Sequence, residues 1–561
     1  MLLLAVVLLF LIRCAVQVPP TGGPVDSIPP EILSEFPGNG NLNIPLDTEI
    51  SITFSEKMDK VSVEKAFFIS PQPDSYPEFR WKGSRLTIKY NEELITERTY
   101  VINIGAGAID LHRIPMKESY SWAFSTGSSI DKGFVTGKIY TFEEKVKGLI
   151  WAFLMDGEQK PDPFRRKGDY ITQTDEEGNF RLSFLSEGKY RIFALNDKNE
   201  DLNYSIFTDQ IGIASADIDV TENDTVSGLK FQTSLIDTLP PAISLIQPID
   251  EHHISVRFNE PLKRSSILPG NIRIEDINTN NEIRDSLTAF YQTAEDKNSI
   301  LIYAQELDPG AEYRLSFSEI SDEHFNRIDI LADSTTIFPA SALDDTVKLR
   351  LVSLFPPDSS EEIPLYSPIE FRFNHPIRYG DFTGNFSLID SSGNRTSGAF
   401  EQISPVEINF IPEEFLRTQM PYRIRLEAEN IHGSGGAPFL IDKTEFIFLT
   451  MNSRQTGALF GRLEIEGGAA DSPVIVQLMQ KDSEESKRRV ILNSSGDFEF
   501  LAVPRGEYTL SAYLDVDGDG EWSKGRVDPF IPSEPFVIYP DILTVRPGVD
   551  NTGNNIILKI H

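Results

Sequence analysis

The chain has 561 residues and a formal net charge of −33, and these totals exclude several classes of protein. It is longer than one hydrophobic core usually serves, and its ordinary apolar content of 40% predicts several globular domains instead of a disordered chain. The acidic excess would repel a phosphate backbone, so we expect no nucleic-acid partner. The single cysteine, Cys14, excludes an intrachain disulfide and a cysteine-based metal site.

The N-terminal segment predicts export and a lipid anchor. Residues 2–12, LLLAVVLLFLI, are an unbroken apolar run, too short to span a bilayer as a helix but typical of a secretory signal. Cys14 and a Pro/Gly-rich stretch follow. This order resembles a bacterial lipoprotein signal, which implies a signal peptide over 1–13, lipidation of Cys14 and a tether over 14–29. Arg13 departs from the small residue that such signals prefer, and a plain signal peptide with an incidental cysteine is the alternative.

One phrase recurs three times along the chain, as ITFSEKM (52–58), VRFNEPL (256–262) and FRFNHPI (371–377). In each copy apolar residues alternate with polar ones, which predicts a strand with one buried and one solvent-facing side. Downstream of each copy a leucine precedes a tyrosine by six residues, and a further strand follows the tyrosine. The pairs are Leu94 and Tyr100, Leu307 and Tyr313, and Leu416 and Tyr422.

Three such units of about a hundred residues, rich in short strands and turn signals, predict tandem β-sandwiches. The strand phrase, together with turns such as LDPGAEY at 307–313, resembles the bacterial Ig-like domain of the surface-layer (SbsA-type) family. The resemblance implies Ig-like domains over 30–127, 239–342 and 347–451.

A second repeat fills the remaining length. Residues 178–205 align without a gap with residues 496–523, and both copies contain G-x-F-x-F followed by G-x-Y-x-L. The pattern resembles carboxypeptidase regulatory-like (transthyretin-like) β-sandwiches, which implies non-catalytic domains over 133–236 and 455–561 with the two phrases on neighbouring strands. The predicted fold class is therefore all-β, a tandem array of about five β-sandwich domains.

An acidic loop near the C-terminus is the clearest indication of a binding site in the sequence. Three aspartates spaced two apart, followed by Gly520, could fold around one hard cation such as Ca²⁺. Position twelve is Arg526 and not the glutamate of an EF-hand, so a solvated acidic hairpin is the alternative. The predicted ligands are Asp515, Asp517, Asp519, Glu521 through its carbonyl, and Asp528.

No catalytic site is predicted. Glu56 and Asp59 could be an acid–base pair, but the third copy of the phrase has His375 at the position of Glu56, which favours a turn role. The seven histidines are dispersed and no pair has metal-ligand spacing, so we expect no zinc site. The stretch HGSGG at 432–436 lacks the first glycine of a nucleophile elbow. We therefore expect no enzymatic activity and no required cofactor.

The sequence favours a non-catalytic lipoprotein of a Gram-negative cell envelope, with a structural, scaffold or adhesion-type role. The alternative is a glycan- or peptide-binding accessory module of an envelope enzyme or uptake system. The expected partners are the outer membrane, through Cys14, and a protein or glycan ligand that the sequence does not identify. No acidic residue follows directly after Cys14, which favours the periplasmic side over the cell surface.

Overall fold

The computed structural model describes most of the chain beyond the N-terminal segment. The predicted signal peptide, Cys14 and most of the predicted tether lie outside the described residues. The chain divides into two compact units at residues 233 and 234. In the part that the structure describes, no helix is both long and apolar enough to cross a lipid bilayer. The described residues are 27–73, 75–140, 148–155, 160–199, 203–221, 225–283, 287–293, 296–304, 307–329, 334–468, 472–481 and 483–560.

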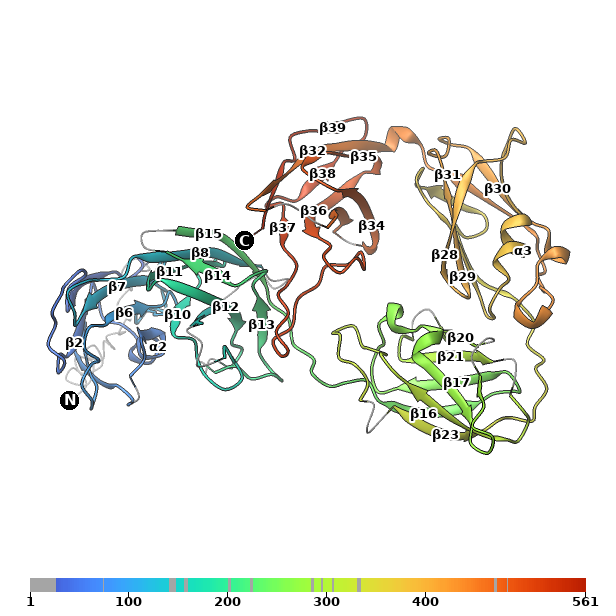
Figure 1. The fold of residues 1–561 in the computed structure, drawn as a ribbon. Helices are drawn as coiled ribbons and strands as arrows, with labels where there is room; N and C mark the ends of the chain where they lie inside the picture. Colours follow the sequence, from blue (N-terminus) through green and yellow to red (C-terminus); the bar gives the residue numbers. More distant parts are fainter. Residues whose placement is uncertain are drawn as a thin grey trace, which may run out of the picture. The chain divides into compact units, whose positions relative to one another are not determined.

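Strands dominate the described residues, as Figure 1 shows, so the predicted all-β fold class is confirmed. The strands of the described residues form ten sheets, which pair into five sandwiches, and each pair of sheets encloses its own apolar core. We call these the first to fifth sandwiches in chain order. The first and second belong to the N-terminal unit, and the other three to the C-terminal unit.

The first sandwich pairs a sheet of order β1-β2-β5-β4 with one of order β3-β6-β7. A short helix, α2 (Lys60–Ala66), lies between β2 and β3; Asp59 caps it by accepting a hydrogen bond from the backbone N–H of Ser62. The strands are β1 (Ile32–Phe36), β2 (Ile50–Phe54), β3 (Phe67–Ser70), β4 (Glu78–Lys82), β5 (Arg85–Lys89), β6 (Thr99–Ile104) and β7 (Tyr120–Ser125).

The third sandwich repeats this strand order as β16-β17-β21-β20 opposite β18-β22-β23, with β19 added beside β18. Ile254, Val256 and Phe258 of the recurring phrase are buried, as the alternation predicted. The strands are β16 (Ile243–Pro248), β17 (His253–Phe258), β18 (Ile272–Asp276), β19 (Glu282–Ile283), β20 (Leu287–Tyr291), β21 (Ser299–Ala304), β22 (Glu312–Phe317) and β23 (Thr335–Pro339).

The fourth sandwich has the same order again, as β24-β26-β29-β28 opposite β27-β30-β31, with β25 added in parallel beside β31. A second short helix, α3 (Tyr379–Gly384), takes the place of α2 and buries Phe382. The strands are β24 (Leu351–Phe355), β25 (Ser360–Ile363), β26 (Ile369–Phe373), β27 (Phe386–Asp390), β28 (Gly398–Ser404), β29 (Glu407–Pro412), β30 (Pro421–Leu426) and β31 (Glu445–Thr450).

The second and fifth sandwiches share a different topology. In each, the first long strand pairs in parallel with the last strands of the sandwich. The second contains β8 (Gly133–Tyr140), β9 (Leu149–Leu154), β10 (Tyr170–Gln173), β11 (Asn179–Leu185), β12 (Gly188–Asn196), β13 (Gln210–Ile213), β14 (Ile218–Val220) and β15 (Thr225–Gln232). The fifth contains β32 (Thr456–Glu466), β33 (Val474–Gln480), β34 (Ser483–Leu492), β35 (Gly496–Pro504), β36 (Gly506–Leu514), β37 (Phe536–Ile538), β38 (Leu543–Val545), β39 (Asp550–Asn551) and β40 (Ile556–Lys559).

The two phrases of the second repeat do not lie on neighbouring strands, so that expectation is wrong. β11 pairs with β8, whereas β12 pairs with β9, β13 and β14 in the opposite sheet. The fifth sandwich separates β35 and β36 in the same way. Each pair of phrases is therefore a crossover between the two layers of a sandwich. In both copies a residue of the first phrase has a positive φ, Phe184 (61°) in the second sandwich and Ala502 (53°) in the fifth.

The recurring tyrosine has one structural role in the first, third and fourth sandwiches. Its hydroxyl accepts a hydrogen bond from the backbone N–H five residues upstream, directly after the conserved-spacing leucine. The donors are Ile95 to Tyr100 (2.7 Å), Asp308 to Tyr313 (2.9 Å) and Arg417 to Tyr422 (2.9 Å). The leucine enters the core and the tyrosine fixes the turn, which explains the six-residue spacing.

Candidate functional site

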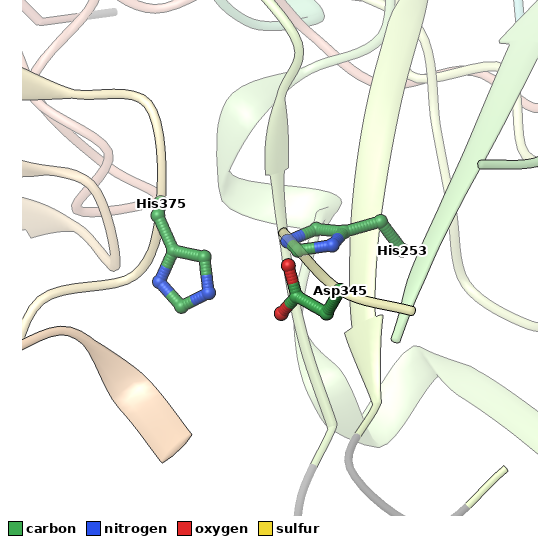
Figure 2. Close-up of side chains that lie close together, drawn as sticks. All are labelled: His253, Asp345 and His375. Carbon is green, nitrogen blue, oxygen red and sulfur yellow. The ribbon is translucent and has the colours of Figure 1, made fainter. Parts of the chain in front are cut away.

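Two histidines that lie far apart in the sequence meet in the C-terminal unit. His253 is on β17 of the third sandwich, and His375 follows β26 of the fourth. With Asp345, from the segment between these sandwiches, they offer ligand atoms that all lie within 4.8 Å of one another. Figure 2 shows the two rings and the carboxylate pointing toward a common centre. We call these three residues the His-Asp-His cluster.

The hydrogen bonds of both rings leave the same nitrogen without a partner. Nδ1 of His253 lies 2.9 and 3.0 Å from the carboxylate oxygens of Asp250, and Nδ1 of His375 lies 3.0 Å from the carbonyl of Pro376. Each Nδ1 faces an acceptor and therefore carries the proton. Each Nε2 is buried and has no hydrogen-bond partner. Leaving a buried polar atom unsatisfied costs about 1–3 kcal/mol, so two such atoms side by side point to a missing group.

Burial and aromatic packing hold both rings of the His-Asp-His cluster in place. His253 is 2% exposed and His375 is fully buried. Burial, followed by the neighbouring His253, lowers the pKa of His375. The ring of Tyr303 packs edge-on against His375, with centroids 4.8 Å apart. The backbone N–H of Asp345 donates to Glu251 (3.1 Å), which holds the connecting segment against the third sandwich.

Further contacts join the third and fourth sandwiches beside this cluster. Arg372 on β26, expected on a solvent-facing side, is only 8% exposed because it pairs with Glu407 and donates to the carbonyl of Tyr291 (3.0 Å). Arg264 of the third sandwich also pairs with Glu407. A small apolar cluster contains residues of both sandwiches: Phe290, Leu301 and Val406.

The structure brings together three of the predicted cation ligands in the acidic loop. Carboxylate oxygens of Asp515, Asp517 and Asp519 lie within 4.8 Å of one another, but Asp528 is not part of this group. Gly520 has the positive φ, 77°, that the predicted tight turn needs. The side chain of Glu521 forms an ion pair with Arg489 at 2.7 Å. Calcium binding by this loop stays a prediction.

Part of the acidic loop is already neutralised from within the protein. The carboxylate of Asp519 pairs with Lys263 of the third sandwich at 2.6 Å. Asp515 accepts hydrogen bonds from the backbone N–H groups of Gly518 (3.0 Å) and Gly520 (3.2 Å). Glu534, which was not among the predicted ligands, is a buried carboxylate that accepts from the backbone N–H groups of Val516 and Ser523. Glu534 follows the loop without any regular spacing, so no sequence signal marked it.

A carboxylate–histidine group recurs at one place in the first and third sandwiches. In the first it contains Glu56, Asp110 and His112. In the third, Asp322 and His324 occupy the equivalent loop, and Asp237 joins them from the segment that leads into the sandwich. The fourth sandwich has His375 in place of the glutamate. Glu56 thus lies beside an aspartate and a histidine of another loop, and Asp59 serves as a helix cap.

Replacing Glu260 with glutamine should flatten the pH dependence of stability of the third sandwich. Burial, and then the nearby carboxylates of Asp237 and Asp322, raise the pKa of Glu260 to about 8 from an ordinary 4.5. The folded state therefore binds more protons than the unfolded state between these values, so stability falls as the pH rises through this range. After discounting for solvent, we expect a loss of about 1 kcal/mol between pH 5 and 9.

Hydrogen-exchange mass spectrometry of peptides from the third sandwich, in increasing urea at several pH values, measures this slope. Asp276→Asn is the matched control, because Asp276 is a surface carboxylate of the same sandwich whose pKa is lowered by backbone hydrogen bonds from Thr279 and Asn278. If the stability of Glu260→Gln depends on pH as steeply as that of the wild type, the pH dependence comes from another group.

Comparison with known proteins identifies a family match for the first sandwich alone. The bacterial Ig-like domain family model matches residues 26–126. No curated protein matches the chain. The N-terminal part of the bacterial S-layer protein SbsC is 15% identical over 38% of this chain and 45% of its own, with a TM-score of 0.16. This chain thus spans less than half the length of that relative.

Two further solved structures are similar at the same low level. Domains 1–6 of surface layer protein SbsC are 10% identical over 93% of this chain and 67% of that chain, with a TM-score of 0.15. An L,D-transpeptidase from Mycobacterium smegmatis is 12% identical over 38% of this chain and 90% of that chain, with a TM-score of 0.16.

Proposed function

We propose that this protein is a non-catalytic structural protein of a bacterial cell envelope, attached to the outer membrane by a lipid at Cys14. The observation that carries the proposal is the series of self-contained sandwiches, each with its own core, of which the first matches the bacterial Ig-like domain family. A series of separately folded domains offers surfaces for binding other molecules. The function of such a protein depends on what its domains contact and not on a catalytic site.

The surface near the acidic loop favours the structural role over a glycan-binding one. A glycan site there would present aromatic rings to solvent. Instead, Trp522 donates its indole N–H to the carbonyl of Glu534 (3.0 Å) and packs edge-on against Phe536.

Protease treatment of intact cells that express the wild type or Cys14→Ala tests the proposal. We expect the wild type to fractionate with the outer membrane and the Cys14→Ala protein to be released in soluble form, since the acyl chains supply the membrane affinity. Protection of the wild type until the outer membrane is breached would assign it to the periplasmic side, and digestion of intact cells would assign it to the surface. Identical membrane retention of both proteins would contradict the lipid anchor.

A further inference from the structure

We propose that His253, Asp345 and His375 bind one zinc ion, which joins the third and fourth sandwiches. The donor atoms of the three residues already gather within 4.8 Å of one another (Figure 2). Zinc–nitrogen and zinc–oxygen bonds of about 2.0–2.2 Å place the ligands of one tetrahedral ion roughly 3.3 Å apart. Shifts of about 1 Å would therefore complete the coordination.

The hydrogen bonds select the form of histidine that a metal needs. Because Nδ1 of each ring faces an acceptor, each Nε2 presents a lone pair toward the cluster. The contact between Asp250 and His253 reproduces the carboxylate–histidine arrangement that orients metal-bound imidazoles. Asp250 is itself held by the backbone N–H groups of His252 (2.9 Å) and His253 (2.8 Å). The residue that would orient His253 as a metal ligand is therefore already held in position.

The alternative explanation for the grouping of the histidines is aromatic packing alone, in which the ring of Tyr303 contacts both imidazole rings. That packing accounts for the carbon faces of the rings but leaves both Nε2 atoms buried without a partner. A metal ion satisfies the two atoms at once, and the half-buried Asp345 supplies a negative charge to balance it. The combination of unsatisfied nitrogens and a nearby carboxylate therefore favours the metal.

The donor set selects zinc over calcium or magnesium. Two imidazole nitrogens and one carboxylate oxygen suit zinc and its transition-metal neighbours, whereas calcium and magnesium require mainly oxygen ligands. Three protein ligands leave one tetrahedral position for a water molecule. The acidic loop, which offers only oxygens, is the opposite case and would serve as an internal test of this selectivity.

The site belongs to the junction and not to the repeated fold. One ligand comes from β17 of the third sandwich, one from the turn after β26 of the fourth, and one from the segment between them. The first and third sandwiches have Glu56 and Glu260 at the position of His375. Two adjoining contacts cross the same junction: Arg264 pairs with Glu407, and Arg372 donates to the carbonyl of Tyr291. A zinc ion here would fix the angle between two consecutive sandwiches.

Calorimetric titration of the metal-free full-length protein with zinc chloride tests the proposal. We expect one site that His253→Gln and His375→Gln weaken by more than 100-fold, and that Asp250→Asn weakens by about 10- to 100-fold. His432→Gln is the matched control, because His432 lies on the fourth sandwich, partly exposed, with only Asp381 beside its Nδ1 (3.0 Å). It should bind zinc like the wild type.

Three further measurements complete the test. Zinc should raise the melting temperature of the wild type but not of His375→Gln, and circular dichroism of the metal-free variants shows whether they are folded. Cobalt(II) should give the intense visible absorption of a tetrahedral site only where the cluster is intact. Failure of the folded, metal-free wild type to bind zinc would overturn the proposal. Equal zinc affinity in wild type, His253→Gln and His375→Gln would overturn it as well, as would calcium binding in competition with zinc at this site.

Discussion

Replacing Glu407 with glutamine is expected to destabilise the junction of the third and fourth sandwiches by about 3 kcal/mol, because it leaves the buried guanidinium of Arg372 without a counter-charge. Arg372 would keep only uncharged hydrogen-bond acceptors, such as the carbonyl of Tyr291. Arg264 contributes less to the loss, since it is more exposed and can turn toward water. Hydrogen exchange of β20 and β26 as a function of urea reports the effect at this junction.

Two further variants separate the charge from the general effect of substitution. Glu401→Gln, at an exposed position on the neighbouring strand β28, should change the stability by less than about 0.5 kcal/mol. The double variant Arg372→Met with Glu407→Leu should recover most of the loss, because an apolar pair can replace a buried ion pair at little cost. If β20 and β26 exchange hydrogen in Glu407→Gln as slowly as in the wild type, the pair of Arg372 and Glu407 is not buried in solution.

Replacing Phe382 with alanine is expected to cost about 3–5 kcal/mol in the fourth sandwich. Phe382 is fully buried on α3, and its ring contacts those of Phe371, Phe373 and Phe386, with centroids 4.9, 5.5 and 6.0 Å apart. Alanine at this position would leave a cavity among large rings that cannot collapse without moving several strands. Urea-dependent hydrogen exchange of β26 and β27 measures the loss.

The matched control for this prediction is Phe415→Ala, which removes the same ring from a position that is 48% exposed in the same sandwich. We expect a cost below about 1 kcal/mol there, because little apolar surface is lost from the core. Phe382→Leu should fall between the two. Equal costs for Phe382→Ala and Phe415→Ala would mean that α3 does not close the core.

Local patterns predicted the fold because each signal acts within a few residues. The alternation in the recurring phrase marked the strands whose apolar residues are buried, and the six-residue spacing of leucine and tyrosine marked a hydrogen-bonded turn. The layer to which a strand belongs depends on the turn before it. The sequence therefore identified β11 and β12 as strands but not their separation into two sheets.

The His-Asp-His cluster could not be predicted in the same way. His253 and His375 come from different copies of the fold and have no regular spacing, so only the packing of two sandwiches brings them together. The burial of Arg372 has the same origin, since alternation predicts an exposed side chain and a neighbouring sandwich covers it. The acidic loop was predicted because its carboxylates are close in sequence as well as in space.

The most direct test of the central claim, that a metal ion fixes the third sandwich against the fourth, is a distance measurement by pulsed electron paramagnetic resonance. Because Cys14 is the only cysteine, a Cys14→Ala protein can carry spin labels at two new sites, for which the exposed Thr335 on β23 and Arg425 on β30 are suitable. We predict one narrow distance distribution with zinc, which broadens on chelation and in His375→Gln. An equally broad distribution with and without zinc would contradict the claim.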